Sequence, residues 1–181
     1  MAIRFRINWQ KALEALVWLA NEKPGVTFYY VVKLLFFADK AHLQKYGRPV
    51  IGDRYIAMPH GPVPTIVYNM LKQDAFLAPD ILDATASSLE INYTGHPSIK
   101  AKRKVNMDHF SETDLECLRE ALEQYGDMPF SRLRKITHAE PAYIEADLNC
   151  EMDYALMIDE DTPDREEKIS DLEDYSHYMV V

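Results

Sequence analysis

The amino-acid sequence predicts an α+β fold that is mainly α-helical, in which a buried central helix is surrounded by other helices and a small antiparallel β-sheet. The first observation is the segment Phe28–Lys45, whose apolar residues cover more than one face of a helix, as in helices that are buried on most sides. The second is that apolar residues recur at helical spacing before and after this segment. The third is a set of short segments with the alternation and flanking turn residues of strands. The 181 residues favour one domain, or one domain with a tail.

The N-terminal part of the chain is expected to form two helices. The first covers Trp9–Asn21, with Asn8 as its N-cap, and it ends at the Lys-Pro-Gly sequence of residues 23–25. The second covers Phe28–Lys45, with Thr27 as its N-cap. Because this second helix is apolar on most sides, we expect it to be the axis of the fold.

Strand patterns follow the second helix. Asp53–Met58 alternates in character and predicts a short strand, and the next six residues, 59–64, contain three prolines that hold the backbone extended or turned. A helix is expected to begin near Pro64. The segments Leu89–Tyr93 and Ser98–Val105 predict a hairpin. We expect this hairpin and the strand at 53–58 to form one small antiparallel sheet.

The remaining elements are mainly helical. Ser111 opens a helix with a sequence resembling a capping box, and Gly126 ends it. A short helix is expected over Phe130–His138, and a helical turn starts at Glu140. The last helix is expected over Pro163–Tyr175, because proline suits a first helical turn and acidic residues follow it.

The formal net charge of −9 is distributed unevenly. Residues 1–110 contain 14 Lys or Arg and 9 Asp or Glu, whereas residues 111–181 contain 6 and 20. The two parts can therefore dock on each other, or the acidic part can bind a basic partner. The overall acidity argues against a dedicated nucleic-acid-binding protein, whose binding surface is usually basic. We therefore do not expect direct nucleic-acid binding.

A local basic cluster stands in the predicted hairpin, formed by Lys100, Lys102, Arg103 and Lys104. These side chains could contact phosphates, or they could be solvated charges that protect a sheet edge from pairing. A further hypothesis places the acidic residues 151–181 on this cluster.

Composition also bears on location and cofactors. No apolar run approaches the roughly 20 residues that span a bilayer, and the N-terminus has no signal-peptide pattern. We therefore expect a cytoplasmic protein that does not insert into membranes. Cys117 and Cys150 fit neither a metal-ligand spacing nor a disulfide framework, so reduced thiols are expected.

Residues 33–72 gather the polar groups that could perform chemistry. One hypothesis is a hydrolase or nuclease that uses Asp39, His42, Asp53 and His60 with or without a metal ion. The alternative is structural. Asp39 and His42 would bond the Arg48 side chain or the following loop, and His60 would bond a carbonyl or stack on an aromatic ring. We favour the structural interpretation, since no HExxH or nucleophile motif accompanies these residues.

Two neighbouring residues have similar alternatives. Asp53 would cap the turn after Gly52 or pair with Arg48, and Tyr55 would face the core or its rim.

Taken together, residues 33–64 resemble the signature of the Panacea domain, also called the SocA-like antitoxin domain. The shared elements are Phe37-Ala38-Asp39, His42-Leu43, Tyr46-Gly47-Arg48-Pro49, Gly52-Asp53, Tyr55 and Gly61-Pro62-Val63-Pro64. The segments 123–127 and 133–138 resemble a second block of the family. The combination is specific, although each tripeptide alone would be weak. The resemblance covers Gln10–Asn149, so we expect residues 1–150 to form this domain and residues 151–181 to form an acidic, helical and docked C-terminal extension.

The resemblance implies a non-enzymatic antitoxin of a bacterial or phage toxin–antitoxin pair, which binds and neutralises a toxin encoded beside it. Because similar proteins include an adaptor that delivers its toxin to a cytoplasmic protease, an AAA+ protease is a candidate second partner. The acidic C-terminal part would suit a basic toxin. No catalytic residue, metal or cofactor is expected.

A preorganised surface between residues 53 and 64 is expected to bind the toxin. The residues assigned to partner binding are Asp53, Arg54, Tyr55, His60, Pro62 and Pro64. Asp39, His42 and Arg48 are expected to hold the local chain path.

Overall fold

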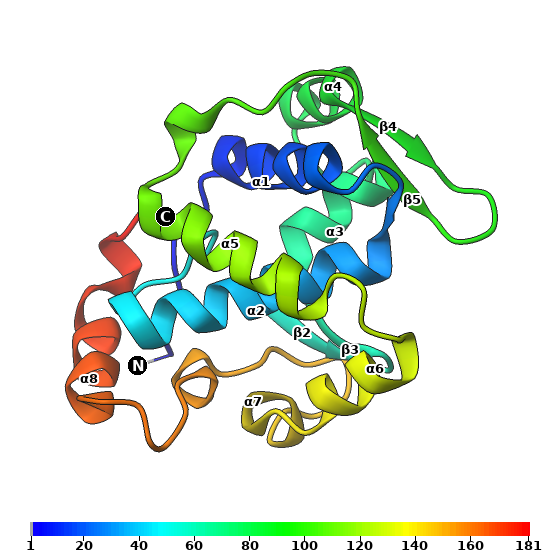
Figure 1. The fold of residues 1–181 in the computed structure, drawn as a ribbon. Coiled ribbons are helices and arrows are strands. Elements are labelled where there is room, and N and C mark those ends of the chain that lie inside the picture. Colours follow the sequence, from blue (N-terminus) through cyan, green and yellow to red (C-terminus); the bar gives the residue numbers. More distant parts are fainter. Residues whose placement is uncertain (1) are drawn as a thin grey trace.

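The computed structural model describes residues 2–181 and shows an α+β fold that is mainly helical (Figure 1). The helices are α1 (Trp9–Glu22), α2 (Phe28–Tyr46), α3 (Thr65–Lys72), α4 (Pro79–Ser88), α5 (Glu112–Tyr125), α6 (Phe130–His138), α7 (Pro141–Ile144) and α8 (Arg165–Tyr175). The strands are β1 (Val26–Thr27), β2 (Tyr55–Met58), β3 (Gly61–Pro64), β4 (Leu89–Asn92) and β5 (Ser98–Ala101). Short 3₁₀ helices cover Met107–His109, Tyr154–Met157 and Ser176–Tyr178. The predicted fold class is therefore confirmed.

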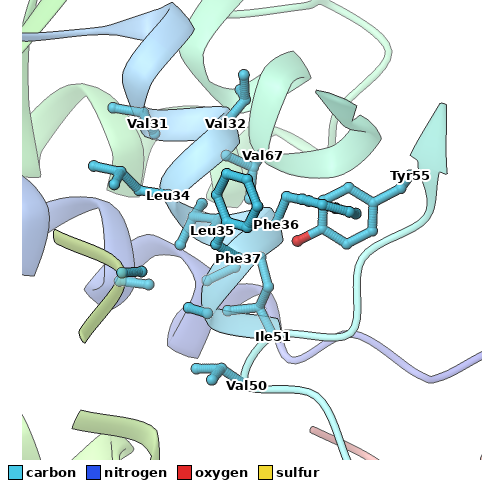
Figure 2. Packing of buried hydrophobic residues seen from close by; sticks show 14 of the residues in the cluster. Val31, Val32, Leu34, Leu35, Phe36, Phe37, Val50, Ile51, Tyr55 and Val67 are labelled. Atoms are coloured by element: carbon cyan, nitrogen blue, oxygen red, sulfur yellow. The ribbon is translucent and has the colours of Figure 1, made fainter. Parts of the chain in front are cut away.

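Helix α2 runs through the centre of the molecule, as its sequence predicts (Figure 1). It is buried over most of its length, and Figure 2 shows its side chains among those of the following loop and β2. Phe36 meets the ring of Tyr55 edge-on at 5.4 Å, and Phe37 stacks on Tyr125 of α5 at 3.8 Å. Such aromatic pairs add to the burial energy of the core. The helix ends at Gly47, whose φ of 73° suits glycine.

Helix α1 packs against β5, α3 and α4, and it begins as predicted. The side chain of Asn8 accepts a hydrogen bond from the backbone N–H of Lys11, which is the expected N-cap interaction. Thr27, in contrast, takes the extended N-cap conformation before α2 without a side-chain hydrogen bond.

The strands pair differently from the prediction. Residues 55–58 form a two-stranded antiparallel hairpin with 61–64, part of the segment whose prolines predict extended or turned backbone without a pairing partner. The hairpin β4–β5 pairs instead with β1, in the order β1-β5-β4. The expectation of one sheet was therefore wrong.

A physical reason lies at the second edge of β2. Backbone hydrogen bonds join it to residues 149–152, as the N–H of Ala57 donates to the carbonyl of Cys150. With both edges of β2 occupied, no edge remains for β4–β5. The prolines of β3 are tolerated because β3 lies at the edge of its pair, where a missing N–H leaves no gap in a ladder.

Two helices differ from the sequence expectation. Helix α4 was not predicted, because its Ser, Thr and Asp residues are weak helix formers. Its Pro79 stands in the first turn, where proline is favourable. Helix α8 begins at Arg165 rather than Pro163, with Asp164 as its N-cap.

The last 31 residues pack along the N-terminal segment and the end of α2. Arg6 and Val180 form a parallel bridge, and Val181 is buried. The ammonium of Lys168 donates to the carbonyl of Gln44. In Figure 1 α8 lies on the side of the molecule away from β4 and β5. The hypothesis that the acidic tail covers the basic residues 100–104 was therefore wrong.

Two further findings concern membranes and thiols. No helix in residues 2–181 is both long and apolar enough to cross a membrane. Cys117 is buried, Cys150 is exposed, and both are free thiols.

Candidate functional site

Asp39 fixes the chain after α2. Its Oδ1 accepts from the N–H groups of Val50 and Ile51 at 2.8 and 2.9 Å, and its Oδ2 accepts from Gly52 N–H at 3.2 Å and the Tyr55 hydroxyl at 3.0 Å. Complete burial raises the pKa of Asp39, and the four hydrogen bonds limit this rise by favouring the charged form. All four donors are structural groups of the loop and β2, so this carboxylate holds the chain path rather than facing a ligand.

His42 and Arg48 join α2 to α5. The Nδ1 of His42 donates to the carbonyl of Arg48 at 2.7 Å, and its Nε2 lies 2.9 Å from the Thr113 hydroxyl. Burial is the largest influence on the pKa of His42 and lowers it. The Arg48 guanidinium donates to Asp114 at 2.9 Å. Asp114 also pairs with the Lys11 ammonium at 3.0 Å and lies 3.4 Å from the Nε2 of His42, so one buried carboxylate connects α1, α2 and α5.

Asp53 caps α3. Its Oδ1 accepts from Ile66 N–H at 3.2 Å and its Oδ2 from Val67 N–H at 2.9 Å, which satisfies two donors at the start of the helix. Burial raises the pKa of Asp53 to about 6. The structure thus corrects the expectation of a partnership with Arg48, whose carboxylate partner is Asp114.

His60 lies at the exposed tip of the β2–β3 hairpin, and its ring centre is 5.9 Å from that of Phe130. It therefore meets an aromatic ring, while Asp39, His42 and Asp53 each bond different structural partners. Within residues 2–181 no group of three or more His, Cys, Asp or Glu side chains could hold a metal ion.

Burial divides the predicted partner-binding residues. Arg54 and His60 are exposed, whereas the other four are buried: Asp53, Tyr55, Pro62 and Pro64. Arg54 pairs with Glu151 at 2.9 Å, and Tyr55 bonds Asp39. The exposed members that can reach a partner are thus at the two ends of the hairpin region.

A groove of about 370 Å³ lies beside the tip of this hairpin. Its wall comes from the start of α2, the hairpin, α3 and the loop before β5, and it consists of Phe28, Tyr29, Val32, Lys33, Met58, Pro59, His60, Val63, Tyr68 and Pro97. The rim is extended by Phe130 of α6, which is 47% exposed and packs against Tyr29 with ring centres 4.5 Å apart. Its size falls in the range of ligand-binding clefts, roughly 300–1,000 Å³.

Lys33 is the one buried cation of this groove. Its side chain is 1% exposed, its Nζ donates to the carbonyl of Pro62 at 2.8 Å, and it lies 5.0 Å from the ring centre of Tyr29. Burial lowers the pKa of Lys33 to about 7. No ion pair within residues 2–181 provides it with a carboxylate. Lys33 was not among the predicted functional residues, although its place within the apolar run 31–38 is a signal in the sequence.

Two polar atoms near the groove are also buried without a partner. They are the hydroxyl of Tyr29 and the Nε2 of His138, among the side chains of residues 2–181. Buried polar atoms are usually satisfied, so unpaired ones call for an explanation such as a ligand or water.

Comparison with known proteins gives one match. No curated protein and no solved structure matches the chain. A family model described as "Antitoxin SocA-like, Panacea domain" matches residues 31–143, which is more than half of the chain and includes most of α2, the β2–β3 hairpin and α6. The chain therefore belongs to the SocA-like antitoxin family with a Panacea domain.

Proposed function

We propose that this protein is an antitoxin that binds a cognate toxin directly and neutralises it. The observation that carries the proposal is the family match, whose name describes an antitoxin and whose range includes the hairpin and part of the groove wall. An antitoxin needs a preorganised protein-binding surface. The hairpin tip, the groove and the exposed ring of Phe130 provide aromatic and apolar contacts of the kind that dominate binding energies.

The proposal places toxin binding on the face formed by the groove and the hairpin tip, which we call the groove face. It includes the exposed His60 and Phe130 together with the start of α2. The buried members of the predicted set, such as Asp53 and Tyr55, would act by keeping the hairpin rigid. A rigid surface loses less entropy on binding, which favours affinity.

The site geometry supports binding rather than catalysis. Three residues of the enzyme hypothesis, Asp39, His42 and Asp53, bond separate structural partners, and His60 meets the ring of Phe130. A hydrolase or nuclease would bring its acid, base and nucleophile within hydrogen-bonding reach of one reacting group.

The experiment begins with the gene beside this one. Its product is expressed alone and together with this protein, and growth is recorded. We expect the neighbouring protein to arrest growth alone, the pair to grow, and the two to co-purify. A neighbouring product that is harmless alone, or that does not co-purify, would contradict the proposal.

Neutralisation by a protease adaptor is the finer alternative. In that mode the toxin would be degraded faster when this protein is present, by a cytoplasmic AAA+ protease. The half-life of the toxin after translation is stopped, with and without this protein, separates the two modes. Simple occlusion leaves that half-life unchanged or lengthens it.

A further inference from the structure

The groove face has an unusual charge environment. Besides the two tyrosines of its wall, the titratable groups at and beside the groove include Lys33, His60, Arg134 and His138, and the groove wall contains no Asp or Glu. None of these four side chains forms an ion pair within residues 2–181. The protein has a net charge of −9, whereas the charge of this face is positive.

The position of Lys33 is fixed by packing. A Cβ added to Gly61 would lie 3.0 Å from the Cε of Lys33 and 2.7 Å from the Thr137 hydroxyl, so Lys33 and Thr137 lie close against the backbone of Gly61, where a larger residue would not fit. Its single hydrogen bond is to the carbonyl of Pro62. Because an ammonium has three donors, two remain for another acceptor.

The wall of the groove is mostly apolar and aromatic. Phe28, Tyr29, Val32, Val63 and Tyr68 provide a surface for a large apolar side chain. The unpaired hydroxyl of Tyr29 adds a donor beside it. An apolar surface next to uncompensated donors and cations matches a ligand that carries both an apolar group and an anion.

We propose that the groove binds a toxin segment that inserts an aromatic or large aliphatic side chain and places an Asp or Glu carboxylate beside it, where it pairs with Lys33. This inference rests on the proposed function and specifies the chemistry of its partner. The binding element would be locally acidic, whereas the sequence-based expectation of a basic toxin concerned the acidic C-terminal part of this chain. The carboxylate would provide Lys33 with the counter-charge that the free protein lacks.

The test uses the neighbouring protein identified by growth arrest. Its affinity is measured by calorimetry for the wild type, Lys33→Met, His60→Glu and the control Lys100→Met, whose side chain is exposed on β5. We expect Lys33→Met and His60→Glu each to weaken binding at least tenfold and Lys100→Met to change it less than twofold. Thermal unfolding of each variant shows that the fold is retained, and His60→Glu keeps the test independent of any change in the core.

A double-mutant cycle then identifies the carboxylate. Asp and Glu residues of the toxin that crosslink to the groove face are changed one at a time to Asn or Gln. One of them should weaken binding to the wild type at least tenfold but leave binding to Lys33→Met nearly unchanged. Additive losses for every such residue would overturn the proposal.

Other results have distinct meanings. If the toxin arrests growth and co-purifies but binds Lys33→Met and His60→Glu like the wild type, this inference fails and the antitoxin function stands. Phenylacetate, but not phenylacetamide, could shift the NMR signals of the groove residues while Lys33→Met and His60→Glu leave toxin affinity unaffected. In that case the groove binds a small carboxylate, and the toxin-segment proposal is overturned.

Discussion

Asp114→Asn removes the carboxylate that joins three helices. Asp114 is buried and pairs with Lys11 at 3.0 Å and Arg48 at 2.9 Å, while its Oδ2 also accepts from the N–H of Ser111. The asparagine keeps one acceptor oxygen but removes the negative charge. The ammonium of Lys11 is then left without a counter-charge in a site where it is nearly inaccessible to water.

The expected loss of stability follows from the burial of this ion pair. Breaking a buried ion pair by removing one partner costs about 3–5 kcal/mol. We expect about 3 kcal/mol, at the lower end, because Arg48 is 30% exposed and can turn to water. The amide oxygen of the asparagine can also keep one hydrogen bond.

The loss of stability caused by Asp114→Asn should become smaller as the pH falls. Burial raises the pKa of Asp114, but the hydrogen bond from Ser111 and the neighbouring Lys11 and Arg48 together outweigh it and hold the pKa below its usual value. A carboxylate with a lowered folded-state pKa stabilises the fold fully above its unfolded pKa, about 3.9, and loses this effect as the pH falls through the folded value. The difference in the free energy of unfolding between wild type and variant should therefore be constant from pH 7 to pH 5 and smaller near pH 3.5.

The assay is urea unfolding followed by circular dichroism at these three pH values. Asp83→Asn is the matched control, since Asp83 is exposed on α4. The control should change the free energy of unfolding by less than about 0.5 kcal/mol. Two results would refute the reasoning. The first is a change in the free energy of unfolding for Asp114→Asn at pH 7 that is as small as that of the control, and the second is a change that stays the same near pH 3.5.

Three other changes test separate parts of the site. Asp53→Ala should destabilise the fold by about 2 kcal/mol in urea unfolding, because the first N–H groups of α3 lose their acceptor; an unchanged midpoint would contradict this role. Lys33→Met should stabilise the free protein by about 1–2 kcal/mol at pH 7, since it removes a buried amine without a counter-ion. The pKa of Lys33 is lowered to about 7, so the wild type gains stability between pH 7 and 10 and the advantage of Met should shrink there. Gly61→Ala should cost about 1–3 kcal/mol in thermal unfolding, because φ is +108° and the added Cβ would press on Thr137; a stability equal to the wild type would show that the hairpin tip can relax.

The helices could be predicted because their signals are local. Apolar periodicity and capping residues such as Asn8 and Ser111 define α1, α2 and α5 from neighbouring residues alone. The partner of β2 could not be predicted in the same way. Prolines 62 and 64 are compatible with either an extended or a turned backbone and do not indicate a paired strand, and the other edge of β2 is occupied by residues almost 100 positions later.

The site shows the same division between local and distant information. The sequence indicated that Asp39 bonds the following loop, because the acceptor and the loop are close in the chain. The charge balance of Asp114 and Lys33 depends on distant segments. Asp114 is compensated by Lys11 and Arg48, whereas Lys33 meets only the carbonyl of Pro62, and periodicity distinguishes neither case.

Hydrogen exchange of the complex with the growth-arresting neighbour tests the central claim most directly. The account predicts slower exchange in residues 28–33, 58–64 and 130–138, which form or flank the groove face, and no change in α4 and β4. Protection confined to α4 and β4, with the groove face exchanging as in the free protein, would contradict it.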